Sequence, residues 1–274
     1  MNFVEKQMLG RGEYGAVRVL HQDGKEFALK ETELKVYPEE LEVVIACLRE
    51  EAMNCVHKHI IHRYWCRFWK KKFQVCMELG EPVKRAEGYL IMHDIGQALC
   101  FMHSHGFIHR DVKPENIVLV GDTYKLIDFG LTRKQSGGQM TGYMVTRWFR
   151  PPELLALKDF EHHKYDGRCD MWSLATTAAF LQTGEPLFYG DADEILAMYK
   201  AYKPKGVLKH LLCDYKDRWT AKEMLLNNGI EPIEGSLSFV KEREGNVGDF
   251  VNLMLKGRED LADAYSHEKI YSDL

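Results

Sequence analysis

Two short polar strings, about a dozen residues apart, constrain this chain more than any other feature. The first runs from His109 to Asn116 and reads HRDVKPEN; the second runs from Asp128 to Gly130 and reads DFG. They place an aspartate, a lysine and an asparagine at fixed offsets in one loop, and a further aspartate directly after an apolar run. Oxygen donors of this kind suit magnesium, a hard cation. The two strings therefore supply groups that can hold a nucleotide, its magnesium and an attacking hydroxyl in one place.

A glycine-rich stretch, Gly10 to Val17, precedes both strings. It lies between two apolar runs, which predicts a strand, a turn and a strand rather than the strand-to-helix turn of dinucleotide-binding folds. Glycines let backbone amides approach phosphate oxygens because no Cβ stands in the way. Asp23-Gly24 then predicts a hairpin turn, and the apolar run from Phe27 leads to Lys30.

In this order, the glycine-rich stretch, Lys30 and the two strings resemble the motifs of eukaryotic protein serine/threonine kinases. The resemblance implies an α+β protein kinase fold of two lobes over residues 1–228. Residues 1–79 would form a small β-rich lobe with one main helix at about 39–56. Residues 80–228 would form a larger helical lobe.

Two later strings extend the resemblance. Residues 169–175 resemble the start of the buried central helix of the larger lobe, and residues 214–218 resemble a late motif in which Arg218 pairs with Glu153. Residues 229–274 match no pattern of this kind. We expect this extension to pack on the larger lobe, with a partner-binding tail as the alternative.

The resemblance implies that ATP is bound between the lobes. Lys30 would hold the α- and β-phosphates, Met77 would guard the back of the site, and backbone groups from Glu78 to Gly80 would pair with adenine. The full set of expected nucleotide-binding residues is Leu9, Gly10, Arg11, Gly12, Glu13, Tyr14, Gly15, Val17, Ala28, Lys30, Met77, Glu78, Leu79, Gly80 and Val118.

The same resemblance assigns the chemical roles. Asp128 and Asn116 would each hold a magnesium ion. Asp111 would accept the proton of the substrate hydroxyl, and Lys113 would balance charge on the transferred group. Lysine at this position is the pattern of serine/threonine kinases.

Lys30 should also pair with a glutamate of the small-lobe helix, and two candidates remain open. Glu50 follows Arg49, as in the arginine-glutamate pair of related kinases. Glu51 has the better helical neighbours, because Cys55 four residues later is apolar.

Residues 128–153 form the expected activation segment. Its TGYMVTRWFR string, from Thr141 onward, resembles the lip of mitogen-activated and cyclin-dependent kinases. Thr146 would bond Asp111 and Lys113. Thr141 would be the activating phosphosite, with Tyr143 a second; an unmodified, already ordered loop is the alternative. The arginines that would receive the phosphate are Arg49, Arg110 and Arg133.

The chain also departs from these kinases. Residues 81–88 are too short for the usual extra helix, and the usual insert is absent between Thr183 and Cys213. The docking grooves and cyclin contacts of those kinases therefore cannot be assigned to this chain. The resemblance implies protein substrates, with preference for proline after the phosphoacceptor, and an upstream activating kinase. Whether the chain requires a regulatory subunit is left undecided by the sequence.

Charge, hydropathy and residue spacing bear on the partners, the location and the metal content of the protein. A net charge of -4 argues against general nucleic-acid affinity. The sequence shows neither a charged-then-apolar leader nor an apolar run of membrane-spanning length, so we expect an intracellular protein, cytoplasmic or nuclear, that binds no membrane. Five closely spaced residues suggest a metal site, but their spacing fits no zinc pattern. They are Cys55, His57, His59, His62 and Cys66.

Two other functions compete with kinase activity. A pseudokinase scaffold would require loss of Lys30, Asp111, Asn116 or Asp128, and all four are present. A small-molecule kinase on a similar fold is disfavoured by the intact substrate-binding lip between Thr146 and Glu153.

Overall fold

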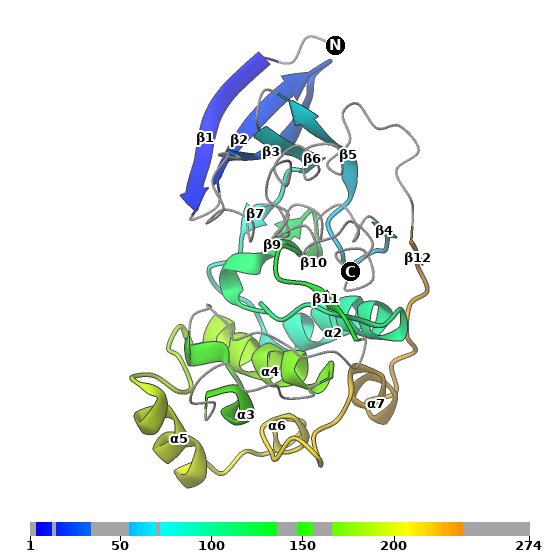
Figure 1. Ribbon diagram of the computed structural model, residues 1–274. Helices are drawn as coiled ribbons and strands as arrows, with labels where there is room; N and C mark the ends of the chain where they lie inside the picture. Colours follow the sequence, from blue (N-terminus) through cyan, green and yellow to red (C-terminus); the bar gives the residue numbers. More distant parts are fainter. Residues whose placement is uncertain are drawn as a thin grey trace, which may run out of the picture.

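The computed structural model describes residues 4–12, 15–33, 55–69, 72–135, 147–155 and 166–237. Within these residues the chain forms a strand-rich lobe and a helical lobe, one above the other in Figure 1. The predicted α+β fold with two lobes is therefore confirmed.

One antiparallel sheet of five strands, in the order β1-β2-β3-β6-β5, forms the small lobe. Side chains alternate between the two faces of each strand, and Leu20, Leu29 and Cys76 pack together as a buried cluster. Asp23 and Gly24 both have positive φ, 51° and 76°. A type I′ hairpin turn requires this, so the predicted hairpin is confirmed. The strands are β1 (Val4–Gly12), β2 (Gly15–Gln22), β3 (Lys25–Glu33), β5 (Arg63–Trp69) and β6 (Lys72–Glu78).

The predicted end of the small-lobe helix is a strand instead. The sequence predicts a helix over about 39–56, of which residues 39–54 lie outside the described residues. Cys55–Val56 form β4, which pairs antiparallel with β12 (Ser236–Leu237). Cys55 is 3% exposed and packs in the core of the larger lobe. The helical prediction is wrong there because pairing with a distant segment overrides the local apolar period.

The turn that follows β4 leads to β5, which begins at Arg63. Ile60 forms an isolated parallel bridge with Leu126. The amide of Ile61 donates to the Leu126 carbonyl at 3.1 Å, and the amide of Leu126 donates to the His59 carbonyl at 2.9 Å. These bonds dock the turn before β5 onto β10 (Thr123–Leu126).

Two long helices, α2 (Gly88–Ser104) and α4 (Arg168–Thr183), form the centre of the larger lobe. Apolar residues at helical spacing form the buried face of α2: Ile91, Ile95, Leu99 and Met102 are each 0% exposed. No described helix is long and apolar enough to cross a membrane. The shorter helices are α3 (Pro152–Leu155), α5 (Ala192–Ala201), α6 (Leu208–Leu211) and α7 (Ala221–Asn227), with 3-10 turns η2 (Pro114–Asn116) and η3 (Arg147–Phe149).

Short strands position the two polar strings. β9 (Ile117–Val120) and β10 form an antiparallel hairpin, and β7 (Glu81–Pro82) pairs with β9. The hairpin begins directly after Asn116 and ends two residues before Asp128. It therefore brings the end of one string next to the start of the other.

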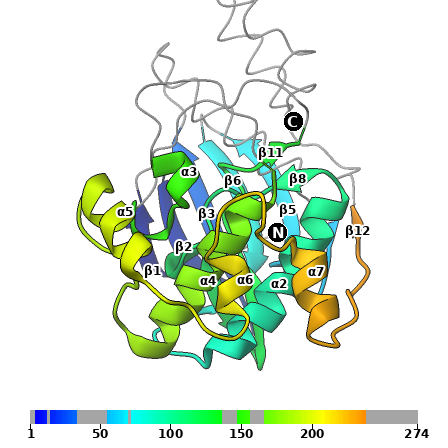
Figure 2. The same cartoon turned by 90° about the horizontal axis from the view of Figure 1, so that it is seen from below.

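Beyond α7 the chain continues to β12, the orange strand beside α7 in Figure 2, which lies next to β4 in Figure 1. The buried Gln97 of α2 donates to the Glu231 carbonyl at 2.8 Å and accepts from the Ile233 amide at 2.7 Å. Described residues of the C-terminal extension thus pack along α2 and then pair with β4. Residues 238–274 lie outside the described residues, and their packing stays a prediction.

The predicted pair between Arg218 and Glu153 is present. Arg218 Nη1 and Nη2 lie 2.6 and 3.0 Å from the two Glu153 oxygens, and the arginine side chain is 0% exposed. Its guanidinium also donates to the Cys213 and Arg168 carbonyls and lies over the ring of Trp172. A buried charge of this kind is costly once its partner is removed.

Replacing Glu153 by glutamine should lower the free energy of unfolding by about 3–5 kcal/mol, because the Arg218 charge stays buried without its counter-ion. Urea denaturation followed by circular dichroism measures the change. The control is Glu26→Gln, which breaks the pair of Glu26 (52% exposed) with His21 and should cost about 0–1 kcal/mol. Equal losses for the two variants would contradict the argument.

Candidate active site

The loop from His109 to Asn116 is held by one buried carboxylate of α4. Asp170 accepts the backbone amides of His109 at 2.9 Å and Arg110 at 2.7 Å, and its Oδ2 lies 2.9 Å from the ring Nε2 of His103. Burial acts to raise the pKa of Asp170, but the hydrogen bond and charge of His103, the charge of His109 and the backbone bond from Arg110 outweigh burial and lower the pKa. The Asp170 carboxylate thus holds the backbone of Arg110, whose φ of 71° is uncommon for a residue with a Cβ.

Asp111, Lys113 and Asn116 form a connected group inside this loop. Asn116 Nδ2 donates to both the carbonyl and the carboxylate Oδ2 of Asp111, each at 2.8 Å. Lys113 Nζ lies 2.9 Å from the same Oδ2. Asp111 Oδ1 receives no hydrogen bond from the described residues. Burial raises the pKa of Asp111 despite the opposing charge of Lys113, so this carboxylate holds a proton more readily than an exposed one.

Lys30 and Asp128 join the two lobes. Lys30 Nζ, on β3, lies 2.9 Å from Asp128 Oδ1 in the larger lobe. The neighbouring Phe129 is 0% exposed and packs edge-on against the His109 ring at 5.4 Å. Asp128 itself has a φ of 63°. The buried phenylalanine thus anchors the DFG string while its aspartate faces the lysine of the other lobe.

The strands align several expected nucleotide-binding residues. Lys30 pairs in register with Val17 on β2, and Ala28 pairs with Met77 on β6. A Cβ on Gly15 would clash with the Glu31 carbonyl oxygen, which explains glycine at the start of β2. Leu9, Gly10, Arg11 and Gly12 lie on β1, which pairs with β2.

The segment between the lobes packs closely on β9. A Cβ on Gly80 would lie 2.6 Å from Cγ2 of Val118, so glycine permits this approach. The Glu78 carboxylate accepts from the His62 amide at 3.1 Å and from Lys125 Nζ at 2.6 Å. Its side chain therefore links the lobes, and its amide donates to the His62 carbonyl at 3.0 Å, so neither group is left for the predicted contact with adenine. Leu79 lies between these two residues, directly after β6.

Two of the three expected phosphate-binding arginines are described: Arg133 lies on a strand, and Arg110 lies in the loop just after the partner strand. Arg133, on β11 (Arg133–Lys134), pairs with Ile108 of β8 (Phe107–Ile108), two residues before Arg110. Arg110 Nη1 donates to the Leu131 carbonyl at 3.3 Å. Several predicted site residues lie outside the described residues, and their roles stay predictions: Glu13, Tyr14, Arg49, Glu50, Glu51, Thr141, Tyr143 and Thr146.

Sequence reasoning missed the residues that support the catalytic loop. His109 Nδ1 lies 3.2 Å from the Asp111 amide, and its Nε2 lies 3.2 Å from the Ile127 carbonyl. His103 and Asp170 fix the loop from α2 and α4. The supporting role of Asp170 could have been predicted, because it is the acidic residue of the string at 169–175. No local sequence pattern indicates that the histidines are its partners.

Comparison with known proteins identifies the family. The protein kinase domain family matches residues 3–256. Cyclin-dependent kinase F-4 of Oryza sativa subsp. japonica is 35% identical over 204 residues, which cover 69% of this chain and 44% of that protein. Serine/threonine-protein kinase ICK of Rattus norvegicus is 33% identical over 218 residues, or 74% of this chain and 34% of that protein. Serine/threonine-protein kinase MAK of Homo sapiens is 31% identical over 210 residues, or 70% and 33%.

The alignments span less than half the length of these three relatives. The family match nevertheless covers most of the chain, including both polar strings and Lys30. Members of this family generally use ATP and magnesium. The relatives also confirm the predicted resemblance to the mitogen-activated and cyclin-dependent group of kinases. By its domain, its motifs and its relatives, this chain belongs to the protein kinase family.

Proposed function

We propose that this chain transfers the γ-phosphoryl group of ATP to serine and threonine hydroxyls of proteins. The observation that carries the proposal is the contact between Lys30 and Asp128 across the lobes, beside the connected group of Asp111, Lys113 and Asn116. Phosphoryl transfer depends on alignment and charge neutralisation more than on covalent catalysis. These five residues supply both.

The donor atoms fit magnesium. Both hydrogen bonds from the Asn116 side chain use Nδ2, which leaves Oδ1 for a cation. With the carboxylate of Asp128 this gives an oxygen-only set, which suits a hard ion that keeps several waters. Magnesium bound there would neutralise charge on the phosphates. Lys30 would hold the α- and β-phosphates while its ammonium stays close to Asp128.

The chemical step follows from the positions of the other two residues. Asp111 accepts the proton of the substrate hydroxyl as that oxygen bonds to the γ-phosphorus. The bond from the γ-phosphorus to the bridging oxygen of ADP breaks, and ADP keeps the electron pair. Lys113, bound to Asp111 Oδ2 at 2.9 Å, places a positive charge beside the transferred group.

A degenerate peptide array with magnesium-ATP tests the activity and its specificity. We expect phosphate on serine and threonine peptides and not on tyrosine peptides, with enrichment of proline after the phosphoacceptor. Asp111→Asn protein, prepared in parallel, measures any co-purifying kinase. Phosphate on tyrosine peptides would refute the serine/threonine assignment. An array without proline enrichment would refute the proline preference alone.

We further propose that an upstream kinase activates the chain at Thr141. The added phosphate brings a charge of about -1.5 to -2. Arg133, on β11, and Arg110, two residues after its partner strand β8, could receive it. Without phosphate these arginines repel one another. Phosphorylation would order the lip and align Asp111, with Tyr143 a second site and Thr146 bonded to the catalytic loop.

Thr141→Ala should therefore turn over as slowly as phosphatase-treated wild type, at least about tenfold below the phosphorylated protein, since about 1.4 kcal/mol changes a population ratio tenfold. Initial rates on one array-selected peptide measure this. Thr123→Ala, an exchange on β10 outside the lip, is the control and should keep the wild-type rate. Equal rates for the alanine variant and for treated and untreated wild type would show constitutive activity.

A further inference from the structure

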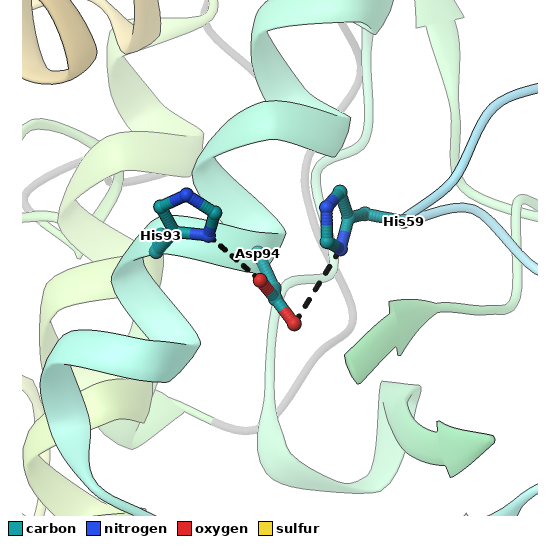
Figure 3. A group of neighbouring side chains, drawn as sticks. All are labelled: His59, His93 and Asp94. Atoms are coloured by element: carbon teal, nitrogen blue, oxygen red, sulfur yellow. Dashed lines mark hydrogen bonds and ion pairs between the residues drawn. The ribbon is translucent and has the colours of Figure 1, made fainter. Parts of the chain in front are cut away.

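We propose that His59, His93 and Asp94 form a binding site for a divalent transition-metal ion of the zinc type, separate from the magnesium site. Their ligand atoms all lie within 4.8 Å of one another. Figure 3 shows both imidazole rings directed toward the Asp94 carboxylate. His59 comes from the turn between β4 and β5, whereas His93 and Asp94 come from α2.

The separations are close to those that a tetrahedral ion needs. His59 Nδ1 lies 3.5 Å from Asp94 Oδ2, and His93 Nδ1 lies 2.7 Å from Asp94 Oδ1. Zinc bonds of about 2.0–2.2 Å at tetrahedral angles place neighbouring ligand atoms roughly 3.3–3.6 Å apart. The two distances involve different Asp94 oxygens. For an ion bound to Oδ2 the His59 distance already fits, and the His93 ring, which contacts Oδ1, reaches the same ion by a turn of its partly exposed side chain.

The donor chemistry also suits zinc. Two imidazole nitrogens and one carboxylate oxygen, with water in the fourth position, are a common zinc-ligand set. Metal ligands must be deprotonated. Burial acts to raise the pKa of Asp94, but its bonds with His59, His93 and the Tyr124 amide outweigh burial and lower the pKa. The carboxylate is therefore an anion at neutral pH.

A backbone contact orients the carboxylate ligand. The Tyr124 amide donates to Asp94 Oδ2 at 3.0 Å, which fixes the carboxylate against β10. His59 Nδ1 lies 3.2 Å from the Tyr124 carbonyl, so without metal this nitrogen carries the ring proton. Metal binding at Nδ1 replaces this hydrogen bond and moves the ring proton to Nε2, which is buried without a hydrogen-bond partner among the described residues. An outer contact such as that of the Tyr124 amide typically changes metal affinity by about 10–100-fold.

The site is closed on one side and open on the other. The side chains of His59 and Asp94 are 1% and 13% exposed, whereas that of His93 is 39% exposed. A cation can enter from the side of His93, keep a water ligand there and reach the buried pair behind it. Bound metal would tie the turn before β5 to α2, next to the strand that leads to Asp128.

The arrangement differs from the cluster that the sequence suggests. Among the described residues, His59 alone of that cluster belongs to the three-ligand group. Burial raises the pKa of the Cys55 thiol to about 11, so it is not a thiolate at neutral pH. Burial and the nearby His59 lower the pKa of His57 to about 4, and its ring stacks on Phe101 at 4.9 Å. The metal ligands come together only through folding of α2 against the turn.

Calorimetric titration of the chelator-treated full chain with zinc, in excess magnesium to occupy the oxygen sites, tests the proposal. We expect one zinc equivalent in wild type and at least tenfold weaker binding in both His93→Ala and Asp94→Asn. His105→Ala removes an exposed histidine at the other end of α2 and should bind as wild type does. Circular dichroism checks folding, and the exposed position of His93 keeps that variant informative if Asp94→Asn does not fold.

Cobalt substitution distinguishes this site from adventitious binding to cysteine. At the proposed site Co²⁺ should give visible bands of a nitrogen-oxygen set without the intense ultraviolet band of a thiolate ligand, and His93→Ala should lose them. Absence of zinc binding to wild type would overturn the proposal. Equal zinc affinity in all four proteins, or a thiolate band that persists in the His93 variant, would also overturn it.

Discussion

Asp128→Asn and Lys30→Met should each reduce phosphoryl transfer to background while leaving the fold intact. Asp128 is the carboxylate proposed to hold magnesium, and Lys30 Nζ, 2.9 Å from it, is the cation proposed to hold the phosphates. Asparagine keeps the shape of Asp128 but removes the charge that a divalent ion needs. Removal of one preorganised electrostatic group in a transfer site typically costs about 10²–10³ in rate, and loss of the metal should cost more.

Rates of γ-phosphate transfer to one array-selected peptide, measured with magnesium-ATP, check this result, and circular dichroism checks the fold. Lys25→Met is the matched control, because Lys25 is an exposed lysine at the start of the same strand, β3, and should keep the wild-type rate. If either site variant folded and kept near-normal turnover, the assignment of that residue would be wrong.

Asp111→Asn should remove most turnover, about 10²–10⁴-fold, and leave ATP affinity nearly unchanged. The carboxylate bonds only Asn116 and Lys113 among the contacts described, and its proposed partner is the attacking hydroxyl rather than the nucleotide. Asparagine cannot accept the proton at neutral pH. The loss should therefore fall on kcat and not on nucleotide binding.

Calorimetric titration with a non-hydrolysable ATP analogue, together with steady-state rates, separates these two quantities. Glu115→Gln is the control, because this exposed acidic residue lies next to Asn116 in the same loop and should alter neither. Burial raises the pKa of Asp111, so the fall of wild-type kcat/KM on the acid side should lie above the ordinary range of an aspartate. A large loss of nucleotide affinity in the variant would contradict the proposed role.

The sequence by itself determined the fold class and the active-site strings. HRDVKPEN and DFG are contiguous, so the offsets among Asp111, Lys113 and Asn116 are set by covalent connection. The Asp23-Gly24 turn is a local feature as well, and the structure confirms it; the apolar period of α2 is equally local and becomes its buried face. Arg218 and Glu153 are far apart in the sequence, but each belongs to a short motif for which the resemblance predicts the other as partner. Their bidentate ion pair is present in the structure.

Tertiary structure alone decided how distant segments meet. Cys55–Val56 carry a helical apolar period, yet they form a strand because Ser236–Leu237 reach them along α2. The Glu78 carboxylate contacts Lys125, which lies on a strand of another sheet far along the sequence. His59, His93 and Asp94 converge from a turn and a helix whose separation in sequence carries no spacing signal. Local sequence encodes backbone preference and motif chemistry, whereas such contacts depend on how whole elements pack, because burial and backbone pairing override local periodicity.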